Sequence, residues 1–267
     1  MSQISIEFFS RSLIRPVQFK MVIPNDGNPD WHPEQKREGK PMKVIFLLHG
    51  YTGAAGNWIP EYLCTLYNFA VVTPSGENGF WVDGISTGHK YATFLAEELV
   101  DYVRSTFHLA MTPEDTFVMG MSMGGFGALH TALAYPDRFS KAIALSSALI
   151  VKGVAHMQPG TDNGVANYEY YRECFGDLET VLSSRNNPEV LVEEILAEGK
   201  AMPEIFMACG TEDFLLEPNR DFHKYLESKN VEHHYYESAG VHDMVFWEEY
   251  AKKLVPLLFE EGREEQK

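Results

Sequence analysis

The sequence predicts an α/β fold in which helices cover both faces of a mostly parallel central sheet. Short apolar runs without polar alternation recur along the chain, as expected of strands that are buried on both faces. Segments with helical spacing of their apolar residues separate these runs, and this alternation is typical of parallel sheets. A chain of 267 residues that is 45% hydrophobic can also bury a full core. We therefore expect a single domain over residues 1–267.

Two strands are predicted at the start of the chain, at residues 4–9 and 17–23, and we expect them to pair antiparallel. Residues 24–41 are rich in proline, glycine and charge, which predicts an exposed loop. Strands and helices alternate after this loop. The further predicted strands are residues 44–48, 69–72, 116–119, 142–145, 204–208 and 231–236. The predicted helices are residues 91–107, 124–135, 218–229 and 244–259.

Residues 148–200 interrupt this alternation with irregular sequence and one helical stretch near 188–198. We expect an insertion above the sheet, acting as a partial lid, and not a second domain. Its aromatic residues are candidates for such a lid, although tyrosine-rich loops are as often ordinary packing: Tyr168, Tyr170, Tyr171 and Phe175.

The charge and the chain ends limit the classes of partner. Counting 22 basic and 38 acidic residues gives a formal net charge of −16, which disfavours nucleic acids and anionic membrane surfaces. No apolar stretch approaches the length of a membrane span. The N-terminus has no basic region followed by an apolar one, and the three cysteines include no C-x-x-C pair. We therefore expect a cytoplasmic protein with reduced cysteines.

The segment Gly120-Met121-Ser122-Met123-Gly124 is a G-x-S-x-G motif between a predicted buried strand and a predicted helix. This setting is that of a nucleophile elbow, a strained turn that exposes a serine at the carboxyl edge of a parallel sheet. Glycine is required at 120 and 124 because side chains there would clash with the closely packed helix. Ser122 is therefore the candidate nucleophile. The alternative is a glycine-rich helix start with an incidental serine.

A serine hydroxyl is a poor nucleophile unless a base takes its proton. His242 follows the last predicted strand, and parallel strands bring their carboxyl ends to one edge, so His242 and Ser122 are expected at the same edge. The other histidines considered lie inside predicted elements or in segments of less certain place: His89, His130, His156, His223, His233 and His234. Position in the chain favours His242 as the base.

A carboxylate must hold the histidine in its working tautomer and stabilise the imidazolium. Asp213 follows the strand predicted at 204–208 and lies at the same edge. The chain order serine, aspartate, histidine is the order expected for this fold. Glu212 competes from the neighbouring position, Asp243 is too close to the histidine in sequence, and Asp177 in the insertion is a more distant alternative.

The negative charge of the transition state needs hydrogen-bond donors, each contributing roughly 3 kcal/mol. The backbone N–H of Met123 at the helix start is one candidate. The other is expected in the turn at residues 49–53, where a glycine lets the backbone turn its N–H toward the serine. We expect the N–H of Tyr51 to be this donor, with that of Thr52 as the alternative.

Aromatic residues on loops are candidates for substrate contact, above all Trp58 and Trp81, with Phe80 and Tyr91 as further ones. Any of them is equally compatible with core packing. The sequence has no H-E-x-x-H, G-x-G-x-x-G or P-loop motif, so we expect neither a metal ion nor a cofactor.

These residues and their surroundings resemble a known family. The matching segments are Phe46-Leu47-Leu48-His49-Gly50, Asn57-Trp58, Asn78-Gly79-Phe80-Trp81, the G-x-S-x-G segment with Gly125, residues 209–215, and Gly240-Val241-His242-Asp243-Met244-Val245-Phe246-Trp247. Together they resemble the esterase D-like group of α/β-hydrolases, and within it the tributyrin esterase (EstA-like) carboxylesterases. The resemblance covers nearly the whole chain. Met244 departs from the family, which usually has an aromatic residue there.

The resemblance implies a serine carboxylesterase that hydrolyses short-chain acyl esters, acetyl to butyryl, through Ser122, Asp213 and His242. It also implies an oxyanion hole formed by the N–H groups of Tyr51 and Met123, and assembly into dimers or tetramers. Thioesterases of the S-formylglutathione hydrolase type and feruloyl or acetylxylan esterases remain alternatives, since the same triad serves them all. A non-catalytic binding module would have lost a triad residue, whereas all three are present.

Overall fold

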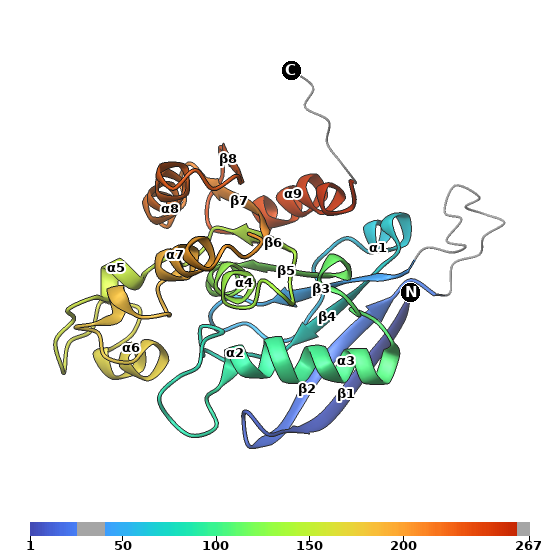
Figure 1. Ribbon diagram of the computed structural model, residues 1–267, viewed down its shortest axis with the longest axis horizontal. Helices are drawn as coiled ribbons and strands as arrows, with labels where there is room; N and C mark the ends of the chain where they lie inside the picture. Colours follow the sequence, from blue (N-terminus) through green and yellow to red (C-terminus); the bar gives the residue numbers. More distant parts are fainter. Residues whose placement is uncertain (26–40, 261–267) are drawn as a thin grey trace.

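The computed structural model describes residues 1–25 and 41–260, and its centre is one eight-stranded sheet (Figure 1). The strands are β1 (Ser2–Ser10), β2 (Arg15–Ile23), β3 (Lys43–Leu48), β4 (Phe69–Pro74), β5 (Thr116–Met121), β6 (Lys141–Leu145), β7 (Glu204–Gly210) and β8 (His234–Ser238). Their order is β1-β2-β4-β3-β5-β6-β7-β8. The pairs β1–β2 and β2–β4 are antiparallel, and the others are parallel. The predicted mostly parallel sheet and its antiparallel opening are confirmed.

Helices cover both faces of this sheet. They are α1 (Glu61–Tyr67), α2 (Tyr91–Thr93), α3 (Val100–Phe107), α4 (Met123–Ala134), α5 (Val151–Val154), α6 (Tyr168–Phe175), α7 (Pro188–Glu198), α8 (Leu216–Ser228) and α9 (Met244–Leu254). Side chains alternate along β3: Phe46 and Leu48 pack in one core cluster with α3 and α4. Ile45 and Leu47 pack in a second cluster with α1 and α9 on the opposite face (Figure 1). A strand buried on both sides explains the continuous apolar run.

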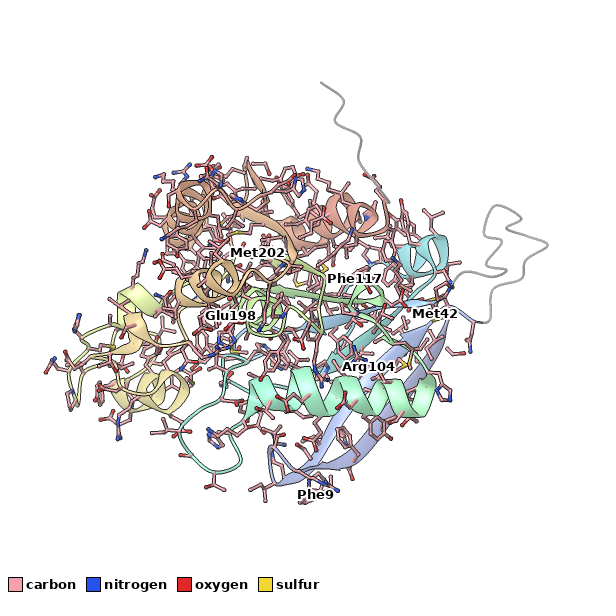
Figure 2. All side chains as sticks on the ribbon, in the orientation of Figure 1. Phe9, Met42, Arg104, Phe117, Glu198 and Met202 are labelled. Carbon is pink, nitrogen blue, oxygen red and sulfur yellow. The ribbon has the colours of Figure 1, made fainter. Side chains whose placement is uncertain are left out.

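Side chains in the interior of the sheet are buried, whereas some at its edge are exposed. Phe117 of the central strand β5 is fully buried, whereas Phe9 near the end of the edge strand β1 is 60% exposed (Figure 2). The three cysteines, Cys64, Cys174 and Cys209, are buried and unpaired. Burial raises the pKa of each thiol to about 12. None of the helices in residues 1–25 and 41–260 is both long and apolar enough to cross a bilayer.

The predicted helix at 91–107 is one continuous helical rod in which the π-helical segment Phe94–Leu99 joins α2 to α3. The last strand begins at His234 and not at residue 231, because the N–H of Val231 bonds to Leu226 O and closes the end of α8. The final helix ends at Leu254 and continues as the 3₁₀ turn Val255–Phe259. The exposed loop predicted at 24–41 falls almost entirely outside the described residues.

The insertion at 148–200 contains α5 and α6, which the sequence did not reveal, and α7, which it predicted. It lies beside the sheet, at the left in Figure 1. Leu191 and Val192 of α7 pack against Leu129 and Leu133 of α4. The insertion is thereby anchored on the helix that begins immediately after Ser122.

Candidate active site

Ser122 occupies the sharp turn between β5 and α4, with φ 55° and ψ −121°. A non-glycine residue in this region is strained and is held there by its surroundings. A Cβ added to Gly120 would lie 2.1 Å from the carbonyl oxygen of Gly124, and a Cβ added to Gly124 would lie 2.2 Å from that of Leu48. The close approach predicted for both glycines is therefore present in the structure.

Backbone hydrogen bonds fix this turn from the neighbouring strand. The N–H of Ser122 donates to Leu145 O at 2.8 Å, and the N–H of Ala148 donates to Ser122 O at 2.9 Å. Both partners lie at or just beyond the carboxyl end of β6. Both the N–H and the C=O of the strained serine are thus hydrogen-bonded to the end of β6 or the residues just after it.

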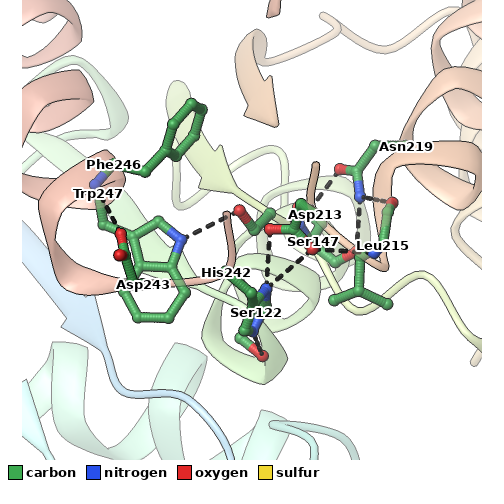
Figure 3. Close-up of polar contacts among 10 residues, drawn as sticks. Ser122, Ser147, Asp213, Leu215, Asn219, His242, Asp243, Phe246 and Trp247 are labelled. Carbon is green, nitrogen blue, oxygen red and sulfur yellow. Dashed lines mark hydrogen bonds and ion pairs between the residues drawn. The ribbon is translucent and has the colours of Figure 1, made fainter. Parts of the chain in front are cut away.

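The structure brings together the three residues that the sequence singled out (Figure 3). His242 Nε2 lies 3.0 Å from Ser122 Oγ, and His242 Nδ1 lies 2.9 Å from Asp213 Oδ2 and 3.0 Å from its Oδ1. A carboxylate only accepts hydrogen bonds, so Nδ1 carries the proton and Nε2 accepts from the serine hydroxyl. This is the tautomer that a general base for the serine requires.

Asp213 is held from several sides at the end of β7. Its side chain is fully buried, and Leu215 N–H donates to its Oδ1 at 2.8 Å. Burial alone would raise the pKa of Asp213. The hydrogen bonds from His242, from Leu215 N–H and from the Ser146 hydroxyl together hold the pKa below its usual value. The carboxylate therefore stays charged beside the histidine.

The alternative acids do not contact the histidine ring in the described part of the chain. Glu212 accepts a hydrogen bond from Gly240 N–H at 2.7 Å, and Asp243 caps α9 by accepting from Phe246 N–H at 3.1 Å. Asp177 accepts from a backbone N–H within the insertion. The other histidines considered have partners elsewhere: His89 with Glu173, His130 with Arg185 O, His156 with Glu179, His223 with His233, and His234 with Glu204.

Two aromatic rings enclose His242. Trp247 meets the imidazole edge to face at 4.9 Å between centroids, and Phe214 lies 4.5 Å away on a tilted plane. Trp247 Nε1 also donates to Ser146 Oγ at 3.0 Å. Trp247 therefore contacts both His242 and Ser146, the two side chains whose hydrogen bonds lower the pKa of Asp213.

Two backbone N–H groups near Ser122 have no acceptor within residues 1–25 and 41–260. They belong to Tyr51 and Met123, and both residues line the same cavity as the serine. A Cβ added to Gly50 would lie 3.4 Å from Ser122 Cβ, which shows how closely this loop approaches. The alternative donor, Thr52 N–H, is already bonded to Asn78 Oδ1 at 2.8 Å. It is therefore not free for an oxyanion.

His49, at the end of β3, fixes the start of this loop. Its Nε2 accepts from Gly76 N–H at 2.9 Å, and its Nδ1 lies 2.8 Å from Gly50 O, to which it donates. Burial lowers the pKa of His49, which favours the neutral ring that this pair of bonds requires. The histidine thereby joins the loops that follow β3 and β4.

Ser122 and His242 line a cavity of about 520 Å³, within the usual range of small-molecule sites. The lining is mostly apolar and comes largely from the insertion, at residues 148–154, 163, 165, 170–171 and 187–189. Its charged members are Lys152, Glu189 and Asp221. Lys152 is the single cationic member among the described residues and pairs with Glu189 at 2.6 Å, so this described lining presents no unpaired cation.

The two tryptophans predicted to contact substrate do not line this cavity. Trp81 is fully buried: its indole N–H donates to His49 O at 3.2 Å, and its ring fills the space beside Gly76 and Gly127. Trp81 thus packs beneath the loops that begin at His49 and Gly76. Trp58 packs against the core cluster on the opposite face of the sheet. The further candidate Phe80 does line the cavity.

Sequence reasoning missed several residues of the site. Ser146 and Asn78 bond to partners distant in the chain, Trp247 and Thr52. Asn78 stands in one of the segments that resemble the family, but that segment does not reveal its contact with Thr52, and Ser146 stands in no motif. Phe214 lines the cavity from the turn directly after Asp213. Its place next to the acid was a usable signal, because loops at this edge of the sheet surround the ligand.

The pKa of Asp213 predicts a difference in acid stability. Because its folded pKa lies below the unfolded value of about 3.9, the ionised carboxylate stabilises the fold above that value. This stabilisation is lost as the pH falls through the lower, folded pKa. We expect the stability gap between the wild type and Asp213→Asn, measured by urea unfolding between about pH 3 and pH 6, to shrink toward acid. Parallel stability curves would contradict this assignment.

Comparisons with known proteins agree with this geometry. The Esterase family model matches residues 28–257. The acetyl esterase of Caldicellulosiruptor saccharolyticus is 36% identical over 254 residues, which cover 94% of this chain and 95% of that protein. The predicted resemblance to the esterase D-like group is confirmed by this match.

Solved structures extend the likeness to the whole fold. S-formylglutathione hydrolase (FrmB) from Staphylococcus aureus superposes with a TM-score of 0.80 at 26% identity, over 97% of this chain and 99% of that one. FphF, a fluorophosphonate-binding serine hydrolase of the same organism, gives a TM-score of 0.82 at 25% identity over the same shares. The chain therefore belongs to the esterase family, has the α/β-hydrolase fold, and is an enzyme that hydrolyses carboxylic esters.

Proposed function

We propose that the protein is a serine carboxylesterase that hydrolyses short-chain acyl esters, from acetyl to butyryl, through an acyl-enzyme intermediate. The observation that carries this proposal is the continuous hydrogen-bond chain from Ser122 through His242 to Asp213. This chain borders an apolar cavity that is open to a small ester.

In the acylation step, Ser122 Oγ attacks the ester carbonyl carbon while His242 Nε2 takes the hydroxyl proton. Asp213 stabilises the imidazolium that results. The N–H groups of Tyr51 and Met123 donate to the oxyanion of the tetrahedral intermediate. His242 then returns the proton to the leaving alkoxide, and the alcohol departs from the acyl-serine.

In the deacylation step, a water molecule attacks the acyl-serine carbonyl and His242 takes its proton. The second tetrahedral intermediate uses the same oxyanion donors. Collapse returns the proton to Ser122 Oγ and releases the carboxylic acid. Each group thus serves both halves of the reaction, and neither half requires a metal or an organic cofactor.

The acyl preference rests on the acetyl esterase relative, which matches nearly the whole chain. The thioesterase alternative has support from the likeness to S-formylglutathione hydrolase. Glutathione carries two carboxylates, however. The charged residues that line the cavity in the described part of the chain are Lys152, already paired with Glu189, and the acidic Asp221. A neutral ester fits this lining better than an anionic thioester.

The test is a kcat/KM panel on the purified protein with 4-nitrophenyl acetate, butyrate and octanoate, methyl ferulate, acetylated xylo-oligosaccharides and S-formylglutathione. We expect the maximum at acetate or butyrate. We also expect S-formylglutathione to be at least about a hundredfold poorer. A preference of that size for the thioester, the ferulate or the xylo-oligosaccharides would assign the enzyme to that class instead.

A further inference from the structure

The loop that carries the Tyr51 N–H contains a strained residue. Gly53 N–H donates to Gly50 O at 3.0 Å and closes a four-residue turn, whose third residue, Thr52, has φ 62°. A turn with positive φ at this position alone is of type II, which favours glycine there. A β-branched residue in this region is a genuine outlier and is held only by its surroundings.

Asn78 supplies the restraint. Its side-chain oxygen Oδ1 accepts the hydrogen bond of Thr52 N–H at 2.8 Å. This bond fixes the peptide plane between Tyr51 and Thr52, which is the plane next to the one that carries the Tyr51 N–H. The threonine side chain itself is exposed.

Asn78 is in turn fixed from the insertion. Tyr170 of α6 donates its hydroxyl hydrogen bond to Asn78 O at 2.6 Å. The Tyr170 ring also contacts the Tyr51 ring edge to face, at 5.8 Å between centroids. These contacts fix the position of Asn78. Asn78 thereby links the insertion to the turn at residues 50–53, which carries the Tyr51 N–H.

We propose that Asn78 is a positioning residue that holds Thr52 in its strained conformation and so directs the Tyr51 N–H toward the oxyanion. The inference rests on the proposed function, since it assigns the Tyr51 N–H to the transition state. Asn78 does not line the cavity and acts only through the turn. Its contribution therefore belongs to the transition state and not to substrate binding.

Asn78→Ala is expected to lower kcat about 10- to 100-fold while KM changes by less than about threefold. Affinity for a trifluoromethyl ketone, whose adduct with the serine places an oxyanion in the same position, is expected to fall in parallel. A matched control is Asn57→Ala, because Asn57 also bonds loop backbone, at Ile59 N–H and O, without contacting the turn. The control is expected to keep both kcat and inhibitor affinity within about threefold.

A second substitution separates positioning from a general loss of structure. Glycine adopts positive φ without strain, so Thr52→Gly removes the need for the restraint. The double variant Asn78→Ala/Thr52→Gly is expected to recover kcat to within about fivefold of Thr52→Gly alone. An equal loss from Asn78→Ala in both backgrounds would overturn the proposal, as would Asn78→Ala with wild-type kcat.

Ser122→Ala is measured in the same assays. If it abolishes activity while Asn78→Ala behaves as wild type, only the positioning role fails. If Ser122→Ala keeps full activity, the proposed function fails and the inference falls with it.

Discussion

Ser122→Ala is expected to lower kcat for 4-nitrophenyl butyrate by at least about 10⁴-fold, with little change in KM. The hydroxyl is the nucleophile of the proposed mechanism, and no other hydroxyl in the described residues bonds to His242 Nε2. Residual turnover would come from direct attack of water on the ester, with the backbone N–H donors stabilising the oxyanion that forms. The variant is expected to fold normally, because alanine has a smaller side chain than serine.

The measurement is steady-state kinetics together with labelling by a fluorophosphonate, which the wild type is expected to bind at one site per chain. Ser147→Ala is the matched control. Ser147 is equally close to this edge of the sheet and fully buried, and its hydroxyl has no partner in the part of the chain that the structure describes. The control is expected to keep wild-type activity and labelling. Full activity in Ser122→Ala would refute the mechanism.

Gly124→Ala is expected to reduce both stability and activity. The added Cβ would meet Leu48 O at 2.2 Å and His49 O at 2.7 Å, which are backbone atoms of β3 and its end. Neither atom can move without shifting the strand or the start of α4. We expect a loss of about 1–3 kcal/mol in the free energy of unfolding, the usual cost of overpacking. In addition to this loss of stability, a shift of about 1 Å at Ser122 would lower kcat about 100-fold.

Urea unfolding and kcat/KM measure these two effects separately. Gly56→Ala is the control, since the nearest atom to its added Cβ lies 4.0 Å away and its φ is not positive. That control is expected to change stability by less than about 0.5 kcal/mol. Equal stability of Gly124→Ala and Gly56→Ala would show that the helix adapts freely.

The prediction of the sheet and of the three residues His242, Ser122 and Asp213 depended on one regularity. Parallel strands end at one edge, so residues that directly follow buried runs converge there regardless of their distance in sequence. The sequence favoured Asp213 with Glu212 as a competitor, and the structure separates the two, because neighbouring residues in a turn point in directions that the sequence does not specify. The two side chains bind different partners, Gly240 N–H and the His242 ring.

Trp81 illustrates why the cavity lining could not be predicted. An aromatic residue on a loop at this edge of the sheet faces either the cavity or the core. The local sequence can be the same in both cases, so it does not distinguish them. What decides the outcome is the space left by Gly76, in the loop after β4, and by Gly127 of α4, which both lie against its ring. Such a fit between distant glycines and one large ring is visible only in three dimensions.

Helix α1 was missed because seven residues are too few to show a helical period. The helix α6 begins at a capping residue, Asn167, whose side chain accepts from Tyr170 N–H. This cap is a usable signal, but the surrounding irregular sequence obscured it. Short elements that depend on tertiary packing are the ones that local patterns do not reveal.

The burial of all three cysteines has a consequence for chemical labelling. With thiol pKa values raised to about 12, Cys64, Cys174 and Cys209 carry almost no thiolate near neutral pH. Maleimides and iodoacetamides react with thiolates, so the native chain offers them no ready target. A single cysteine introduced on the exposed face of α6 would carry a fluorophore without prior removal of any native thiol. Such a label would report on the surroundings of the insertion in an otherwise wild-type enzyme.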